Sequence, residues 1–151
     1  NNIPCFSVST LESMAYNFIS TDCIVCAVMD ARCSQVYNAL FKVENGVVTR
    51  LCDDRALSLQ DLKNELLSVD GRIIIAGDGT DITYKYISDE IKNAEPAPVN
   101  LKYQRASSTA IVALEMINNG QTVSPQELMP VYLRLPQAQR ELNKKLGGRT
   151  K

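Results

Sequence analysis

The strongest structural signal in this chain is the stretch CIVCAVMDARCSQVYNALFKVENGVVTRLC, which covers residues 23–52. Residues 24–29 are apolar and rich in β-branched side chains, residues 35–43 form a second, largely apolar segment, and residues 47–52 follow a Glu-Asn-Gly turn. Segments of this length that are joined by short turns are typical of β-hairpins. We therefore predict three consecutive antiparallel strands.

Helical signals lie on both sides of these strands. Ser9 and Glu12 form a capping-box pattern before an apolar face, which predicts a helix over residues 9–18. Ser58 begins a second predicted helix, whose apolar side chains recur at helical spacing until Gly71 lies past its end. Further helices are predicted over residues 81–93 and from residue 107 or 108 to Gly120, and a second capping box over residues 124–127 predicts a short turn.

The remaining segments supply two more strands. Residues 72–76 are fully apolar after the first residue, which predicts a central strand covered on both faces. Residues 99–103 predict a short final strand. The element order is helix, three strands, helix, strand, helix, strand, helix. It predicts an α/β fold of the ribonuclease H-like (actin-like) type, with a five-stranded mixed sheet flanked by helices.

The composition is that of an ordinary globular domain. The chain has 151 residues, of which 45% are hydrophobic and 22% charged. Its apolar runs are far too short to span a bilayer, and the first residues lack the pattern of a secretory signal. Five cysteines, an odd number in or beside apolar stretches, favour reduced thiols over a disulfide framework. We therefore expect a cytoplasmic protein that has no contact with a membrane.

Catalytic chemistry is restricted because the chain contains no histidine. Histidine is the commonest general base and transition-metal ligand, so serine-histidine and cysteine-histidine sites are excluded. Cys23 and Cys26 have the spacing of half a zinc knuckle, but the second pair that a zinc ribbon needs is missing. On a strand, residues three apart also face opposite sides. We expect structural thiols and no metal site.

Gly77, Asp78 and Gly79 are weak candidates for a nucleotide-binding turn. They follow an apolar strand and precede a helix, an arrangement whose backbone N–H groups and helix dipole attract phosphate. The alternative is a tight connection in which glycine supplies unusual dihedral angles. Neither standard phosphate-loop motif is present, and the acidic side chains would repel phosphate. We favour the structural role and expect no bound cofactor.

Polar residues near the first hairpin and an apolar string near the C-terminus are the other features of interest. Asp30, Arg32 and Tyr37 surround the hairpin and form a candidate site, although a local ion pair of Asp30 with Arg32 is the simpler interpretation. Residues 130–134 read PVYLR, and we interpret them as a strap that docks the C-terminus onto the body.

The charge is concentrated at the C-terminus. Residues 134–151 carry six bases and one acid, a net charge of 6 − 1 = +5, which leaves −6 on the rest of a chain whose net charge is −1. A basic tail on an acidic body predicts contacts with a partner rather than a broad nucleic-acid surface on the body. The candidate contact residues are Arg134, Arg140, Lys144 and Lys145.

Four strings, in order along the chain, carry a resemblance to a known family. They are VSTLESMA (residues 8–15), VMDARCSQVYNALF (28–41), AGDGT (76–80) and PVYLRLPQAQRE (130–141). Together they resemble the C-terminal lobe of the bacterial TsaB family, also called YeaZ. The resemblance implies an actin-like, two-lobed protein that is needed to make threonylcarbamoyladenosine in tRNA. It also implies a non-catalytic subunit that pairs with the catalytic paralogue TsaD and is joined by the ATPase TsaE.

Further expectations follow from this resemblance. Residues 1–22 would form an N-terminal connecting helix, residues 23–124 the lobe, and residues 125–151 the strap and basic tail. The family's N-terminal lobe would precede Asn1. The tail is a candidate for contact with tRNA, and a homodimer is a further candidate assembly. The alternatives are a glycoprotease-like metallopeptidase and a fragment of an actin-like ATPase or kinase. This sequence departs from the family pattern at Cys33, Gln35 and Gln139.

Overall fold

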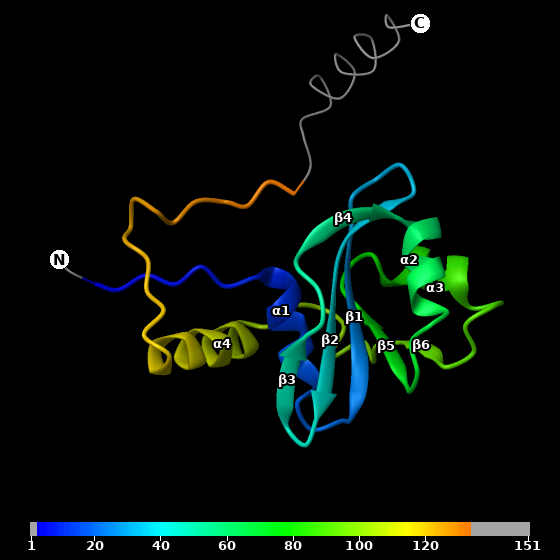
Figure 1. Ribbon diagram of the computed structural model, residues 1–151, viewed down its shortest axis with the longest axis horizontal. Coiled ribbons are helices and arrows are strands. Elements are labelled where there is room, and N and C mark those ends of the chain that lie inside the picture. Colours follow the sequence, from blue (N-terminus) through cyan, green and yellow to red (C-terminus); the bar gives the residue numbers. More distant parts are fainter. Residues whose placement is uncertain (1–2, 134–151) are drawn as a thin grey trace, which may run out of the picture.

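The computed structural model describes residues 3–133 and is shown in Figure 1. Its strands are β1 (Cys23–Asp30), β2 (Gln35–Glu44), β3 (Val47–Arg50), β4 (Arg55–Ser58), β5 (Ile73–Ala76) and β6 (Ala94–Pro96). Its helices are α1 (Thr10–Ala15), the short 3-10 helix η1 (Tyr16–Phe18), α2 (Leu59–Leu66), α3 (Thr80–Ile87) and α4 (Ala106–Asn118).

β1 lies at the centre of the sheet, between an antiparallel and a parallel neighbour. The strand order is β3-β2-β1-β5-β6, and β4 pairs with β2. β1 runs antiparallel to β2 and parallel to β5, and β2 runs antiparallel to β3. The three-stranded meander and the mixed α/β sheet flanked by helices, both predicted from the sequence, are therefore confirmed.

The sheet formed by the described residues has six strands rather than the predicted five. The additional strand β4 is short and shows no apolar alternation, so the sequence gives no local signal for it. It forms by pairing with the first half of β2, where the Arg55 guanidinium also donates a hydrogen bond to the side-chain Oδ1 of the buried Asn38 at 3.1 Å. Tertiary pairing therefore creates this strand.

The strand predicted over residues 99–103 is wrong. The final strand is β6, which pairs with β5, whereas Leu101 closes a turn by donating its N–H to the Pro98 carbonyl at 2.8 Å. β6 lies at the edge of the sheet, where Pro96 costs no ladder hydrogen bond although it has no N–H. The helix predicted over residues 81–93 ends at Ile87 because the chain must turn back to enter β6.

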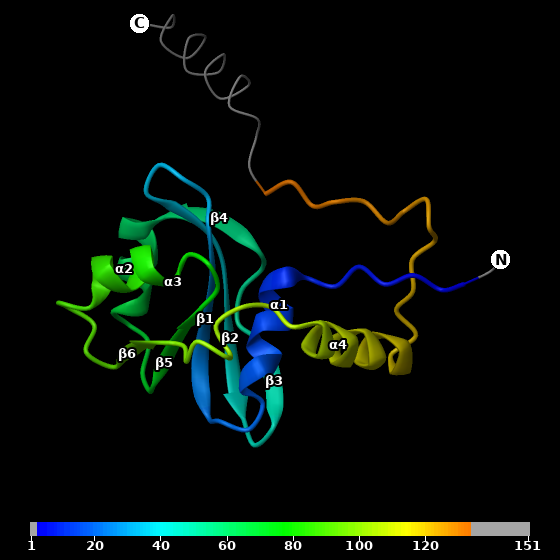
Figure 2. The same cartoon turned by 180° about the vertical axis from the view of Figure 1, so that it is seen from behind.

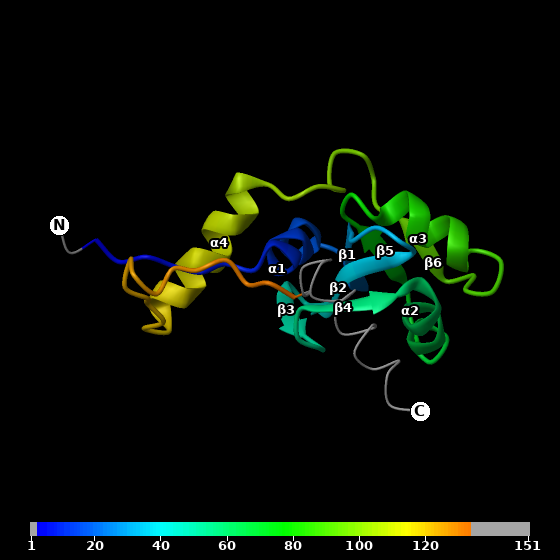
Figure 3. The ribbon, with the colours of Figure 1, turned by 90° about the horizontal axis from the view of Figure 1, so that it is seen from above.

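Alternate residues of β1 face two separate cores. Cys23, Val25 and Ala27 belong to a core that includes Leu11, Met14 and Phe18 of α1 and η1. Cys26 and Val28 belong to a second core that includes Leu62, Leu66 and Ile87 of α2 and α3. In Figure 3 the strands lie between α1 on one side and α2 with α3 on the other. β1 is therefore buried on both faces.

α1 begins as the sequence predicts, but its capping box is only half formed. The Ser9 hydroxyl oxygen accepts the Glu12 N–H at 3.2 Å, which confirms Ser9 as the N-cap. The Glu12 carboxylate instead accepts a hydrogen bond from the Arg50 guanidinium at 2.7 Å. A long-range ion pair therefore replaces one local bond.

α4 lies at one end of the molecule and touches the body mainly through α1 and η1 (Figures 1 and 2). The segment after α4 turns back, and the backbone of Val123 forms an isolated antiparallel bridge with Cys5. α4 and the two segments before α1 and after α4 therefore form one projection. Of the helices within residues 3–133, none combines the length and the apolar character needed to cross a membrane.

Candidate functional site

The turn of Gly77, Asp78 and Gly79 lies directly against the end of β1. The Gly79 N–H donates to the Val28 carbonyl at 3.2 Å, and the Gly77 N–H donates to the Lys102 carbonyl at 2.7 Å. Both glycine N–H groups are thus bonded within the protein. A phosphate held by this turn would have to compete with these bonds.

Gly77 is required here by space as well as by conformation, whereas Gly79 is favoured by the limited space alone. Gly77 has a φ of +115°, and a Cβ atom at this position would lie 1.9 Å from the Val28 carbonyl oxygen. Gly79 has an ordinary φ, but a Cβ atom there would lie 3.2 Å from the Asp30 nitrogen. The turn packs so closely on β1 that a side chain is excluded at Gly77, and a side chain at Gly79 would force its neighbours to shift by a few tenths of an ångström.

Asp78 also has an internal partner. Its carboxylate accepts the Asp30 N–H at 3.0 Å, which caps the end of β1 where the ladder to β2 stops. Behind it, the buried Thr80 hydroxyl donates to the Gly77 carbonyl at 2.7 Å. The geometry of all three candidate residues thus favours the strand-to-helix connection over a nucleotide site.

The hairpin between β1 and β2 contains the expected ion pair. The Asp30 carboxylate accepts the Arg32 N–H at 2.7 Å and lies 3.2 Å from the Arg32 guanidinium, whose side chain is 86% exposed. Arg32, Cys33 and Ser34 have φ angles of 63°, 53° and 55°, so three consecutive residues adopt the left-handed conformation. Cys33 is exposed at this hairpin.

Cys23 and Cys26 lie on opposite faces of the sheet, as their positions on a strand predict. Burial raises the pKa of the Cys23 thiol to about 11 and that of Cys26 to about 12. Both thiols are therefore protonated at neutral pH, whereas a metal ligand must be a thiolate. Within residues 3–133, no group of three or more acidic, cysteine or histidine side chains is placed to hold a metal ion.

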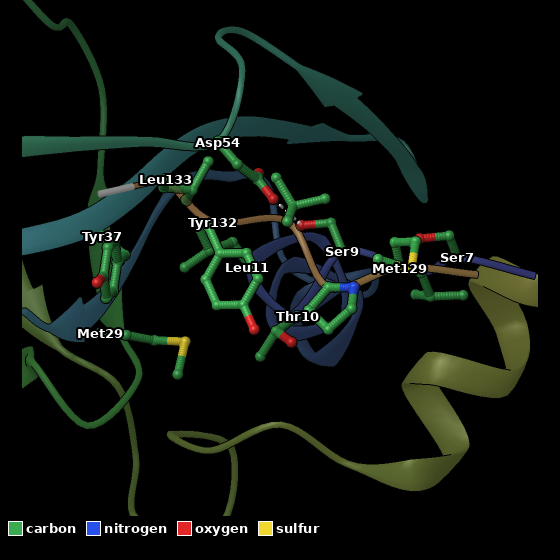
Figure 4. A pocket seen from close by; sticks show the side chains of 13 residues that line it. Ser7, Ser9, Thr10, Leu11, Met29, Tyr37, Asp54, Met129, Tyr132 and Leu133 are labelled. Carbon is green, nitrogen blue, oxygen red and sulfur yellow. Dashed lines mark hydrogen bonds between the residues drawn. The ribbon is translucent and has the colours of Figure 1, made fainter. Parts of the chain in front are cut away.

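A cavity of about 520 Å³ lies beside the N-terminus of α1. Its walls come from residues 7–11, from Met29 and Tyr37 of the sheet, from Asp54, and from residues 129–133 of the strap. Figure 4 shows Tyr132 in the middle of the lining, Met129 beside Ser7, and the hydrogen bond that joins Ser9 to Asp54. Asp54 is the one charged residue among the described side chains of this lining.

A network of charged groups fixes Asp54. Its carboxylate accepts hydrogen bonds from the Ser9 hydroxyl at 2.6 Å and from the Arg50 guanidinium at 2.6 Å, and Arg50 also binds Glu12. Burial opposes the charged form of Arg50, but the hydrogen bonds to Asp54 and Glu12 outweigh it, so the pKa of Arg50 is raised. With Asp54 already paired, the cavity suits an apolar segment better than a cation or a phosphate.

The strap contributes exposed side chains to this cavity. Val131 is 75% exposed and Tyr132 is 84% exposed, so the described part of the strap covers the body only loosely. The candidate contact residues Arg134, Arg140, Lys144 and Lys145 lie outside the described residues, and their role remains a prediction.

Two features were not predicted from the sequence. The Arg50 network joins residues 38 positions apart and leaves no local pattern. The second feature is the apolar side of α4 that Leu114 and Ile117 leave exposed. It does have a sequence signal, because residues 106–118 carry one charged residue, Glu115, and are apolar around most of the helix. Such a helix is normally buried, so its exposure needs an explanation.

No family model matches the chain. The tRNA threonylcarbamoyladenosine biosynthesis protein TsaB of Bacillus subtilis strain 168 is 27% identical over 139 residues, which cover 91% of this chain and 59% of that protein. The chain thus spans less than two thirds of the length of this curated relative.

Two solved structures share the fold. YeaZ from Pseudomonas aeruginosa matches with a TM-score of 0.62 and 20% identity over 85% of this chain and 60% of its own. A protein described as similar to peptidase YeaZ from Pseudomonas aeruginosa matches with a TM-score of 0.62 and 19% identity over 87% of this chain and 59% of its own. These matches show the actin-like, ribonuclease H-like fold. The curated relative and both solved structures thus place TsaB and YeaZ proteins among those that this chain is similar to, in agreement with the resemblance carried by its ordered motifs.

Proposed function

We propose that this chain is the C-terminal lobe of a non-catalytic scaffold subunit in the biosynthesis of tRNA threonylcarbamoyladenosine, working in the cytoplasm beside the catalytic paralogue TsaD and the ATPase TsaE. The observation that carries the proposal is the 27% identity to the Bacillus subtilis biosynthesis protein TsaB over 91% of this chain.

The geometry of the turn at Gly77 supports a non-catalytic role. The two glycine N–H groups bond to Val28 and Lys102, and the Asp78 carboxylate bonds to Asp30. These groups, which were the candidates for binding a nucleotide, hold β5, α3 and β1 together instead. A subunit that acts by contact needs this rigidity and no reactive group at the turn.

The distribution of charge supports a role in assembly. Residues 134–151 carry a net charge of 6 − 1 = +5, which would attract a tRNA backbone or an acidic protein face. The strap leads directly into this segment and presents Val131 and Tyr132 at its surface. We place the contacts with partners on the strap and tail, with Arg134, Arg140, Lys144 and Lys145 as the basic contacts.

A chimeric protein tests the proposal. In a bacterium depleted of its own TsaB, the matched 139 residues of the Bacillus subtilis protein are replaced by the corresponding part of this chain. Threonylcarbamoyladenosine in tRNA is then measured by mass spectrometry, and co-purification with TsaD is measured in parallel. We expect the chimera to restore the modification and to retain TsaD.

Two outcomes contradict the proposal. A folded chimera that neither binds TsaD nor restores the modified nucleoside would show that the chain does not serve in this pathway. A chimera in which Asp78→Asn abolishes modification at unchanged thermal stability and unchanged TsaD binding would show that the turn is an active site. Arg32→Gln, a change in an exposed local ion pair, serves as the matched control.

A further inference from the structure

The described part of the strap ends against the body. Val131 is 75% exposed and Tyr132 is 84% exposed, whereas Leu133 is half-buried and lines the cavity beside α1. Met29 and Tyr37, which are paired in the β1–β2 ladder, form the wall that the sheet contributes to this cavity. Figure 4 shows the strap side chains and these two residues around the same hollow. The residues that follow the strap therefore start at the cavity.

The first residues after Leu133 cannot lie far from the cavity. An extended chain advances at most about 3.6 Å per residue, so the Cα atom of Leu135 lies within about 7 Å of that of Leu133. A short tether of this kind keeps a segment at an effective concentration in the millimolar range. A contact that is too weak to form between separate molecules at micromolar concentration is then populated.

Beyond Arg134 the tail has two halves of different chemistry. Residues 135–142 read LPQAQREL and carry one charge of each sign, with apolar side chains at Leu135, Pro136, Ala138 and Leu142. Residues 143–151 carry four bases and no acid. Because burying unpaired charge is costly, the first half suits an apolar cavity and the second half suits water.

We propose that residues 135–142 dock into the cavity beside α1 of their own chain, with Leu135 and Pro136 against Met29 and Tyr37. A cavity of about 520 Å³ is within the size range of pockets that enclose a small molecule, so it has room for several apolar side chains. Because Arg50 binds Asp54, the docked segment leaves the carboxylate in the cavity wall paired. Another apolar segment enters only after residues 135–142 have left, so the contact is autoinhibitory.

Electrostatics favours the chain's own tail over a foreign segment. The tail carries +5 and the rest of the chain −6, so the two attract each other. The network beside the cavity also holds two carboxylates, Glu12 and Asp54, against the single guanidinium of Arg50. Salt screens this attraction but not the burial of the apolar side chains. The docking concerns this chain alone and does not depend on the proposed function.

Methionine methyl NMR of the full 151-residue chain tests the docking. Met29 lines the cavity, whereas Met116 lies on α4 and takes no part in the lining. Leu135→Asp should shift the Met29 methyl signal and leave that of Met116 unchanged, because a carboxylate at residue 135 opposes burial. Leu146→Asp, the same change in the basic half of the tail, is the matched control and should leave both signals unchanged. Circular dichroism verifies that both variants are folded.

Limited proteolysis with trypsin measures how firmly the segment is docked. Cleavage after Arg140 requires residues 135–142 to leave the cavity, whereas cleavage after Lys144 does not. We therefore expect Leu135→Asp to accelerate cleavage after Arg140 at least about tenfold and to leave the rate after Lys144 unchanged.

A spin label distinguishes docking within one chain from docking between chains. Attached through Gln139→Cys in a Cys33→Ser background, it should broaden the Met29 signal of its own chain, and the background without Gln139→Cys is the control. Broadening in a mixture whose label and isotope are on different chains would overturn the proposal, since a second copy would then fill the cavity. An unchanged Met29 shift in Leu135→Asp, an equal shift in Leu146→Asp or equal trypsin rates after Arg140 would also overturn it, since the cavity would then be left to another partner.

Discussion

Gly77→Ala tests how closely the turn after β5 packs on β1. The new Cβ atom would lie 1.9 Å from the Val28 carbonyl oxygen, 2.9 Å from the Val28 carbonyl carbon and 3.2 Å from the Met14 sulfur. The first two atoms belong to the backbone of the central strand, which cannot move aside as a flexible side chain could. The substitution must therefore displace either the turn or β1.

The loss of stability expected for Gly77→Ala has two parts, backbone strain and steric overlap, and a matched control variant separates them. A φ of +115° strains alanine by about 1–2 kcal/mol, and overpacking adds about 1–3 kcal/mol, so the sum is about 2–5 kcal/mol. Gly71 has a φ of +90°, and no atom lies within 4 Å of the position that a Cβ atom would take there, so Gly71→Ala carries only the strain of about 1–2 kcal/mol. The difference between the two variants isolates the steric conflict.

Urea denaturation followed by circular dichroism measures the free energy of unfolding of both glycine variants. Gly77→Ala should lower the free energy of unfolding by about 1–3 kcal/mol more than Gly71→Ala, with the same dependence on urea. Its melting temperature should then be roughly 2–12 °C below that of Gly71→Ala. Equal losses in the two variants would refute the close packing of the turn on β1, and with it the structural role assigned to Gly77.

Four other predictions follow from the structure and the charge pattern. Asp78→Asn keeps an oxygen for the Asp30 N–H, so its melting temperature and the modification activity of the chimera should both stay close to wild type. Burial raises the pKa of Cys23 to about 11 and of Cys26 to about 12, so these thiols lose their protons at a lower pH in the unfolded chain than in the folded one. The free energy of unfolding should therefore fall as the pH rises above about 9. Urea titrations of Cys26→Ala should show a smaller fall over the same pH range. Calorimetry should detect no micromolar binding of zinc or ATP to the chain, and a clear isotherm would contradict the non-catalytic proposal. Deleting residues 137–151 from the chimera should weaken its binding to tRNA or to TsaD, most at low salt; unchanged binding to both at low and moderate salt would remove the tail from the contact surface.

Local sequence was sufficient for the elements whose signal is strong and continuous. The meander of β1, β2 and β3 was predicted because long apolar segments alternate with short polar turns, and the pattern survives in any fold that buries them. Ser9 and Ser58 cap α1 and α2 as predicted, since an N-cap bond joins residues three apart in the sequence. The placement of Cys23 and Cys26 on opposite faces followed from strand geometry alone.

Tertiary structure decided the features that depend on distant neighbours. β4 and β6 are short strands that exist because β2 and β5 offer them free edges, so propensity placed the last strand at residues 99–103 instead. The sequence named Gly77, Asp78 and Gly79 as candidates, but only the packed structure shows that Val28, Asp30 and Lys102 are their bonding partners. The sequence shows that α4 is largely apolar, but it does not show which side of the helix meets the body. That side is set by the neighbours that pack against it, which here include polar side chains of α1 and η1.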